Sequence, residues 1–318
     1  MKVSLNSQFL EGPYGGGMQF ANFMKDFLKR EGLEVVNNLE ENIDVILHVN
    51  PFPERTPEAS AYSYLEAYKY KQGNPKTVII ERVNECDERK GTNYMNKLLA
   101  EASQKSDFVV FIASWLRPLV LEAGLSENKP WRVILNGADQ RIFNTQGKIW
   151  WEGTGKLKIV THHWSNNPNK GSDIYLKLDE LLSNPKFGDL FEFTYIGRTN
   201  DPFKNTRLVP PLSGKELGEE LRGHHVYVTA SRNEPGGMHH IEGGLCGLPF
   251  LYINSGALPE YCSGFGLEFD ENNFAEKLLE IRAKYDEYKD KVLNYNNTAE
   301  KMGTEYLKLI KQLYAENS

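Results

Sequence analysis

The sequence predicts an α/β fold made of two doubly wound domains, each built on a parallel sheet. Short apolar segments rich in Val and Ile alternate with amphipathic helical segments along most of the 318 residues. Strands covered by helices on both faces have this continuous apolar character, and strand–helix alternation is typical of parallel sheets. The alternation breaks once, over residues 144–156, and then restarts. Because one hydrophobic core rarely serves a chain of this length, we expect two domains.

The first half contains five predicted strands and four predicted helices. The strands are expected at residues 2–6, 44–50, 76–84, 107–114 and 131–137. The helices are expected at residues 18–32, 58–70, 93–103 and 115–124. In the first helix, phenylalanine and methionine recur at helical spacing, and Gly32 is its expected C-terminal cap.

The second half repeats the pattern after the break. Residues 144–156 hold Gly, Thr, Asn and two Trp residues, which indicates a linker near a domain boundary. Strands are expected at residues 157–163, 191–198, 225–231 and 249–255, and helices at residues 172–182, 215–223 and within 272–318. Ligands of open α/β sheets bind beyond the carboxyl ends of the strands, so the loops that follow strands are the first place to look for a site.

Charge and composition exclude several classes of protein. There are 43 acidic and 37 basic residues, a net charge of −6, which argues against binding nucleic acid through bulk positive charge. The N-terminal segment lacks the apolar region of a signal peptide, and no apolar run reaches the length of a membrane span. The three cysteines form no C-x-x-C pair. We therefore expect a cytoplasmic protein with reduced thiols.

Two loops of the first half are candidate binding elements. Gly15, Gly16 and Gly17 precede the first helix, where backbone N–H groups could contact an anion. The alternative is a turn that needs positive φ angles. The loop after the strand at 76–84 is crowded with charged and polar residues, and it is either a solvated loop or a source of binding-site side chains.

The first strand of the second half is followed by a third candidate loop. Lys170 precedes Gly171 at the start of a helix, which suits contact with a phosphate. His162 and His163 end the strand, and each is either a ligand-binding side chain or a hydrogen-bonded structural residue. Trp164 is expected to pack rather than to stack on a base.

The segment "SRNEPGGMHHIEGGLCGLP", residues 231–249, could be a metal site, a nucleophile elbow or an anion cradle. His239 and His240 are adjacent, so they diverge by about 100° on a helix and cannot both face one ion. Ser231 lacks the G-x-S-x-G pattern of a nucleophile elbow. Recognition of an anion and of hydroxyl groups is the remaining interpretation of this segment, and no metal is expected. Pro235 suits a first helical turn, and the residues around it place Glu234 near the helix tip and Glu242 along its side.

These motifs together resemble the retaining glycosyltransferases of the GT-B fold, family 4, also called group 1 glycosyltransferases. Glu234 and Glu242 form E-x7-E, followed by "GGLCGLP" and "SGALPE". "ILNGADQRIF" before residue 144, Lys170-Gly171 and the first glycine loop match further elements of the family in the same order. The resemblance spans nearly the whole chain.

The resemblance implies an architecture and an activity. Two Rossmann-like domains would face each other across a cleft, with a C-terminal helix crossing back to the first domain. Residues 1–150 would bind the acceptor, residues 151–300 the nucleotide sugar, and residues 301–318 would form the returning helix. The enzyme would transfer a sugar, with retention and without a metal or cofactor, from a nucleoside diphosphate sugar to a hydroxyl of a glycan, lipid-linked or small-molecule acceptor.

The resemblance also implies site residues. The expected catalytic residues are Glu234, Lys170, Asn84 and Asp87. The expected donor-binding residues are Gly16, Gly17, His163, Lys170, Arg198, Glu234, Gly236, Gly237, Met238 and Glu242. Glu242 would hold the ribose hydroxyls, Lys170 the diphosphate and Glu234 the transferred sugar. Ser165 stands where the family usually has Arg, so either His163 or Arg198 would substitute, or the diphosphate would be held in another way. The usual first-domain His has no clear counterpart, and Arg82, Asn84 or Asp87 would do related work.

Three other possibilities remain open from the sequence. The chain could be a GT-B nucleotide-sugar epimerase or a phosphorylase-like enzyme. It could instead be a non-catalytic two-domain sugar-binding protein. The first helix, with Phe20, Phe23 and Lys25, could contact the inner face of a membrane, although its apolar stripe is also what a core-facing helix shows.

Overall fold

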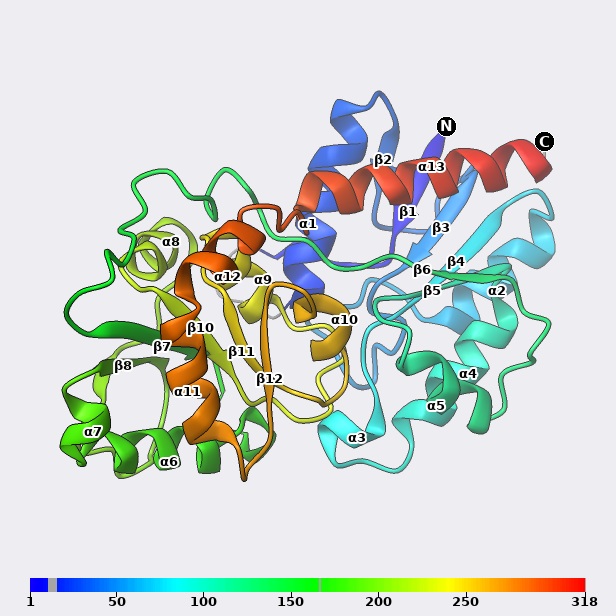
Figure 1. Cartoon of the computed structure of the whole chain (residues 1–318). Coiled ribbons are helices and arrows are strands. Elements are labelled where there is room, and N and C mark those ends of the chain that lie inside the picture. The colour runs from blue at the N-terminus through cyan, green and yellow to red at the C-terminus, as the bar shows by residue number, and fades with distance from the viewer. Residues whose placement is uncertain (11–15, 166, 318) are drawn as a thin grey trace. The chain divides into compact units, whose positions relative to one another are not determined.

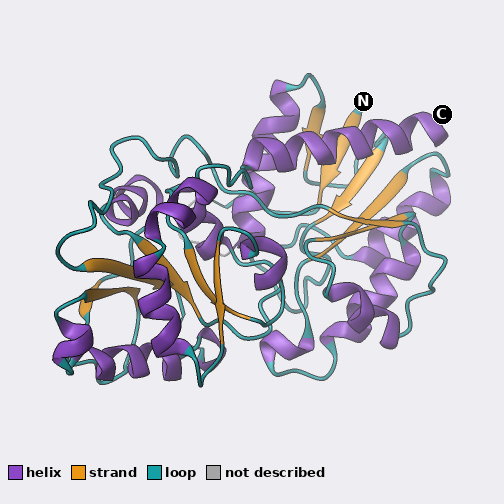
Figure 2. Cartoon of the chain, in the orientation of Figure 1, coloured by secondary structure: helices purple, strands orange, loops and turns teal. Residues whose placement is uncertain are grey.

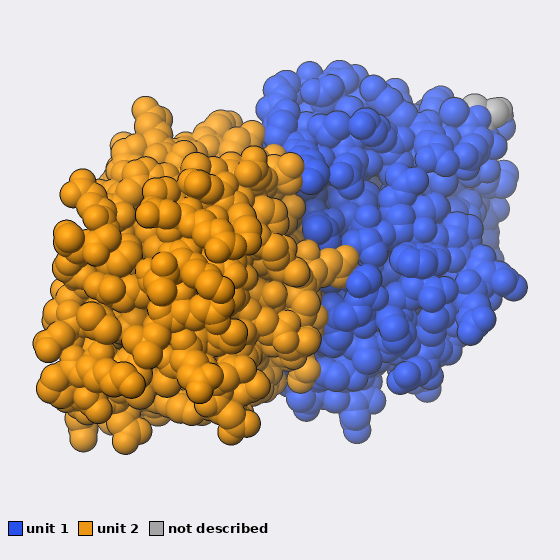
Figure 3. Space-filling model, viewed as in Figure 1, with its two compact units in different colours: residues 1–135, 299–318 blue, residues 136–298 orange. Residues whose placement is uncertain are grey.

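The chain forms two compact units, each with its own parallel sheet. The computed structural model describes residues 1–10, 16–165 and 167–317. Unit 1 comprises residues 1–135 and 299–318, and unit 2 comprises residues 136–298 (Figure 3). Every strand pairing in both sheets is parallel. The predicted two-domain α/β class is therefore confirmed.

The sheet of unit 1 has the order β2-β1-β3-β4-β5-β6. Its strands are β1 (Lys2–Leu5), β2 (Glu34–Val36), β3 (Val45–His48), β4 (Val78–Val83), β5 (Phe108–Phe111) and β6 (Trp131–Val133). The order reverses between β1 and β3, which makes the ends of these strands a switch point where α/β proteins commonly bind ligands.

Helices cover both faces of this sheet, as Figures 1 and 2 show. They are α1 (Gly16–Arg30), α2 (Tyr64–Gly73), α3 (Asp87–Lys90), α4 (Met95–Lys105), α5 (Leu116–Glu122) and α13 (Ala299–Asn317). Helices α1 and α13 share one core with the strands, and the rings of Phe20 and Tyr306 meet there at 5.1 Å between centroids. Helix α2 begins at Tyr64, later than predicted, because Ser63 and Glu66 form a capping box.

The sheet of unit 2 has the order β12-β11-β10-β7-β8-β9. Its strands are β7 (Leu157–His163), β8 (Phe191–Gly197), β9 (Arg207–Val209), β10 (Val226–Thr229), β11 (Phe250–Ile253) and β12 (Gly266–Phe269). Counted within the unit, this is the 3-2-1-4-5-6 order of dinucleotide-binding folds, and its switch point lies between β7 and β10.

The helices of unit 2 also lie on both faces. They are η1 (Pro168–Lys170), α6 (Ser172–Leu182), α7 (Pro185–Gly188), α8 (Gly214–Arg222), α9 (Met238–Leu245), α10 (Leu258–Cys262), α11 (Phe274–Ala283) and α12 (Tyr285–Val292). Helices α6, α7, α11 and α12 pack on one face in a continuous apolar core. Helix α9 contacts β7 and β10, so its residues lie beside the switch point.

The boundary between the units falls after Leu135, whereas the sequence places it after residue 150. The expected linker at 144–156 packs within unit 2 instead. The N–H of Ile149 donates to the carbonyl of Arg222, and the ring of Trp151 packs edge-on against Tyr285 at 5.6 Å. The two tryptophans in this segment therefore belong to the packing of unit 2. None of the described helices is both long and apolar enough to span a membrane.

Candidate functional site

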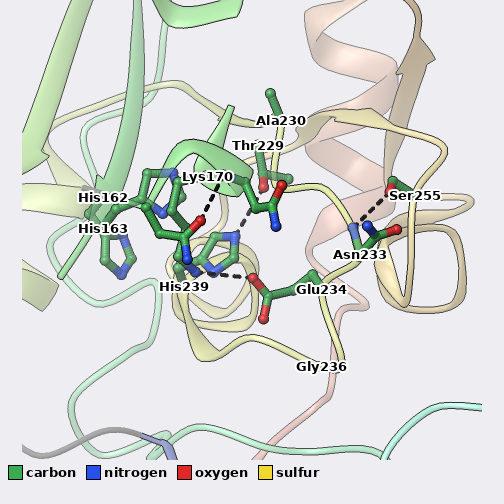
Figure 4. A network of polar contacts seen from close by, with 12 residues as sticks. His162, His163, Lys170, Thr229, Ala230, Asn233, Glu234, Gly236, His239 and Ser255 are labelled. Atoms are coloured by element: carbon green, nitrogen blue, oxygen red, sulfur yellow. Dashed lines mark hydrogen bonds and ion pairs between the residues drawn. The ribbon is translucent and has the colours of Figure 1, made fainter. Parts of the chain in front are cut away.

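The candidate site of unit 2 gathers at the switch point of its sheet. Strand β7 ends at His163 and strand β10 ends at Thr229, and the two strands are hydrogen-bonded neighbours. The loop after β7 carries Lys170, and the loop after β10 carries Glu234. Figure 4 shows these side chains meeting beside the first turn of α9. The sheet topology thus brings together residues that are far apart in sequence.

Lys170 and Glu234 form an ion pair at this point. The distance from Lys170 Nζ to Glu234 Oε2 is 3.1 Å, and the exposed fractions of the two side chains are 15% and 7% (Figure 4). Lys170 ends η1, and Gly171 continues the chain with φ of +89°. A Cβ atom at Gly171 would lie 2.4 Å from the carbonyl oxygen of Ala230. Only glycine therefore lets the Lys170 loop approach β10 this closely.

The loop that carries Glu234 is fixed by backbone contacts. Asn233 has φ of +51°, and its N–H donates to Ser255 Oγ at 2.9 Å (Figure 4). The carbonyl of Glu234 accepts from the N–H of Ala257 at 2.8 Å. A Cβ atom at Gly237 would lie 2.8 Å from Glu234 Cδ, so this glycine leaves the space that the carboxylate occupies. The backbone of the loop and the space beside Gly237 thus allow the Glu234 carboxylate to lie next to Lys170.

Glu242 lies in α9 and contacts the end of β7. Its Oε2 is 2.7 Å from His162 Nε2, and His162 Nδ1 is 3.0 Å from the hydroxyl of Tyr227. All three side chains are buried. The sequence predicted a binding role for Glu242 but not its pairing with His162, because nothing in the local pattern links residues 80 positions apart.

The other histidines of the site form a buried cluster. His163 Nε2 lies 2.8 Å from the hydroxyl of Tyr175, and His239 Nε2 lies 3.0 Å from Thr229 Oγ1. Burial lowers the pKa of His239 well below its ordinary value and lowers the pKa of His240 to about 3. Both imidazoles are therefore neutral at pH 7. Neither nitrogen of His240 has a hydrogen-bond partner among the described residues.

Arg198 lies apart from these contacts, in a pocket at the carboxyl ends of β7 and β8. The pocket has a volume of about 750 Å³. It is lined by Trp164, Ser165, Gly197, Arg198, Thr199, Asn200, Leu208, Val209 and Pro210. The Trp164 and Leu208 side chains are 38% and 52% exposed. Trp164, for which the sequence favoured packing, thus presents part of its ring to this space.

The remaining predicted residues of unit 2 lie around the start of α9. The carbonyl of Gly236 accepts from Asn136 Nδ2 at 2.7 Å. Gly237 is the N-cap of α9 without a side-chain hydrogen bond, and Met238 is the first helical residue. Because the N-cap residue is glycine, it has no side chain that could accept from the first N–H groups of α9.

In unit 1, the structure brings two predicted residues together. A Cβ atom at Gly17 would lie 3.6 Å from Asn84 Nδ2 and 3.5 Å from Asn50 Oδ1. Gly16 and Gly17 open α1, and Gly15 lies outside the described residues. Asn50 lies two residues after β3 and was not singled out from the sequence, although it ends the strand predicted at residues 44–50.

Charged residues within and after β4 are engaged in contacts within unit 1. The carboxylate of Asp87 accepts from the N–H groups of Tyr94, Met95 and Asn96 at 2.8–3.0 Å. These contacts cap the start of α4, so the Asp87 carboxylate stabilises the local structure of unit 1. Arg82 is buried, with its guanidinium 4.0 Å from the centroid of the Phe20 ring. Among residues 1–10, 16–165 and 167–317, no group of three or more His, Cys, Asp or Glu could hold a metal ion.

Comparison with known proteins supports the architecture. No family model matches the chain, and no curated protein matches it. A sucrose-phosphate synthase from Thermosynechococcus elongatus superposes with a TM-score of 0.68, covering 99% of this chain and 100% of that chain at 13% identity. HepE from Anabaena, in complex with UDP-glucose, gives 0.65 over 99% and 98% at 12% identity. The lipopolysaccharide outer core galactosyltransferase WaaB gives 0.66 over 98% and 100% at 11% identity. At these identities the likeness is one of fold, the two-domain GT-B architecture.

Proposed function

We propose that the chain is a retaining, metal-independent glycosyltransferase of the group 1, family 4 type. It moves a sugar from a nucleoside diphosphate sugar to a hydroxyl of a glycan, lipid-linked or small-molecule acceptor. One observation carries this proposal: Lys170, Glu234 and Glu242 gather at the switch point of the unit 2 sheet. The switch point is where folds of this order bind nucleotides. HepE, a protein of similar fold, binds UDP-glucose, which supports the same interpretation.

The diphosphate is held by Lys170 and the start of α9. Lys170 supplies a positive charge in a largely buried setting, and the first N–H groups of α9 lack a capping side chain. Anions bind readily at such helix N-termini. These groups also stabilise the negative charge that the leaving diphosphate gains as the glycosidic bond breaks. This is the basis for proposing that no metal ion is required.

Glu234 changes partner when the donor binds. Without a donor it pairs with Lys170. In the complex, Lys170 forms its ion pair with the diphosphate instead. The freed carboxylate then accepts hydrogen bonds from hydroxyls of the transferred sugar. The acceptor oxygen attacks the anomeric carbon from the face that the diphosphate leaves, and the acceptor proton passes to a diphosphate oxygen.

The nucleoside end of the donor occupies the two remaining features of unit 2. Glu242 accepts from the ribose hydroxyls, and the base enters the pocket with Trp164, Arg198 and Leu208. The Asn50 and Asn84 side chains of unit 1 lie at the ends of β3 and β4, close to Gly17, and we assign these two asparagines to the acceptor side. Asp87 has no place in the proposed chemistry because its carboxylate caps α4.

Calorimetric titration with UDP, GDP and ADP tests the proposal. We expect one of them to bind, and Lys170→Ala and Glu242→Ala to weaken it about 10- to 100-fold, since hydrogen bonds to charged groups contribute about 1.5–3 kcal/mol. Lys215→Ala is the matched control, because Lys215 is 85% exposed and its ion-pair partner among the described residues is Glu219 of its own helix. Equal affinity in the wild type and all three variants would contradict the assignment. So would a failure of the wild type to bind any of the three nucleotides.

Product analysis then tests the reaction type. The anomeric configuration of the product, read by NMR, is expected to match that of the donor, and turnover is expected to persist with EDTA. Sugar release without an acceptor would indicate an epimerase-type reaction, and dependence on inorganic phosphate would indicate a phosphorylase. Sugar binding without any nucleotide requirement would indicate a non-catalytic binding protein.

A further inference from the structure

Glu242 is held at the switch point by a hydrogen-bonded chain of three side chains. Its Oε2 contacts His162 Nε2 at 2.7 Å, and His162 Nδ1 contacts the hydroxyl of Tyr227 at 3.0 Å. The exposed fractions of the His162 and Glu242 side chains are only 5% and 9%. The three residues come from β7, α9 and β10, the elements that form the switch point. These hydrogen bonds therefore connect two strands of the sheet to the Glu242 carboxylate.

The direction of these hydrogen bonds follows from the groups involved. An ionised carboxylate can only accept, so His162 Nε2 carries the proton in that contact. In a neutral imidazole the other nitrogen, Nδ1, must then accept, and the Tyr227 hydroxyl is its partner. Burial raises the pKa of Tyr227 well above 10, so its hydroxyl keeps a proton to donate. The contacts fix one tautomer and one ring orientation of His162.

The arrangement leaves half of the carboxylate for another partner. His162 occupies Oε2, whereas Oε1 has no hydrogen-bond partner among the described residues. A buried carboxylate with no donor at all would be strongly disfavoured in its ionised form. With one donor fixed, the carboxylate stays available as an acceptor in a defined plane.

We infer that His162 is a positioning residue, which holds the Glu242 carboxylate in the orientation that recognises the ribose hydroxyls of the donor. This inference rests on the proposed function, because it assumes that a nucleotide occupies the switch point of unit 2. It assigns to His162 a role distinct from that of His163, whose Nε2 is turned to Tyr175. His162 acts on the nucleotide through Glu242 and not by direct contact.

Paired ligands test this role without relying on turnover. The affinity of the binding nucleoside diphosphate among UDP, GDP and ADP is compared with that of its 2′,3′-dideoxy form, and the ratio measures hydroxyl recognition. We expect a wild-type ratio of about 10- to 100-fold, as for hydrogen bonds to a charged acceptor. In His162→Phe the ratio should fall to within about threefold of one, mainly through weaker binding of the ribose form. In His162→Gln, which retains an N–H donor, part of the ratio should return.

His224→Phe is the matched control. His224 is another buried histidine of unit 2, and its nitrogens contact the Glu220 carbonyl and Thr194, so its loss should lower stability and leave the ratio unchanged. His162→Met provides a second apolar variant if the Phe protein does not fold. A wild-type ratio in either apolar variant overturns the inference. Failure of the wild-type protein to bind any of the three nucleotides overturns the proposed function as well.

Discussion

Replacing Gly171 with alanine is expected to destabilise unit 2 and displace Lys170. Gly171 has φ of +89°, and an added Cβ would lie 2.4 Å from the carbonyl oxygen and 2.5 Å from the Cβ of Ala230. Gly264 offers a matched position in the same unit. Its φ is +86°, and nothing lies within 4 Å of an added Cβ. The two substitutions therefore share the backbone strain and differ in the overlap with β10.

The two contributions can be separated in magnitude. Placing alanine in the left-handed region costs about 1–2 kcal/mol, and this is the whole cost at Gly264. Overlap in a packed interior adds about 1–3 kcal/mol, so Gly171→Ala should cost about 2–5 kcal/mol. For a unit of this size, 1 kcal/mol corresponds to about 2–4 °C in the melting temperature. We expect losses of about 2–8 °C for Gly264→Ala and about 4–20 °C for Gly171→Ala.

Scanning calorimetry of both variants, followed by nucleotide titration, is the assay. The overlap is relieved only if the loop moves away from β10, and Lys170 moves with it. Nucleotide affinity should therefore drop in Gly171→Ala and stay at the wild-type value in Gly264→Ala. Equal melting temperatures for the two variants would refute the reasoning, because the contact with Ala230 would then carry no cost.

Three further predictions concern other parts of the chain. Asp87→Ala should lower the stability of unit 1 by about 1–2 kcal/mol, as for loss of a helix cap, with kcat per folded molecule unchanged; a fall in kcat at full folding would instead give Asp87 a catalytic role. Burial lowers the pKa of His224 to about 4, below the ordinary value of 6.5. Between these pH values the unfolded state therefore binds more protons than the folded state. Stability should fall as the pH drops from 6.5 to 4, by up to about 1.4 kcal/mol per pH unit. His224→Gln should reduce the slope of the urea midpoints across that window without abolishing it, because the buried His225 and His240, whose pKa values are lowered to about 3, still contribute; an unchanged slope would contradict this. Trp164→Ala should weaken nucleotide binding roughly tenfold through lost stacking on the base, with little change in melting temperature because the ring is 38% exposed; unaltered affinity would remove the base from that pocket.

The fold could be read from the sequence where strands are long and apolar. The predicted strand at 157–163 and the predicted helix at 172–182 coincide with β7 and α6. The strands β2, β9 and β12 were not anticipated. Strands β2 and β9 have only three residues each and lie at sheet edges with partly exposed side chains, so neither shows the continuous apolar run of a buried strand.

Part of the site could be predicted from which residues directly follow predicted strands. Lys170 and Glu234 each follow a strand, and neighbouring parallel strands end at the same edge, so their meeting follows from the topology. The partner of Glu242 could not be predicted. His162 and His163 are adjacent at a strand end, where side chains alternate between faces, and the sequence does not say which of the two contacts Glu242. The resemblance implied His163 as a substitute for the missing Arg at the diphosphate and gave no role to His162, whose ring lies beside Glu242.

The inclusion of α13 in unit 1 has a consequence for synthesis. Residues 136–298 are inserted between the two segments of that unit, so unit 2 is complete before the ribosome has made Ala299–Asn317. Until then the apolar residues of α1 and the strands that pack on α13, such as Phe20 and Phe27, remain uncovered on that face. Unit 1, whose first segment is translated first, therefore cannot complete its core until α13 has been made.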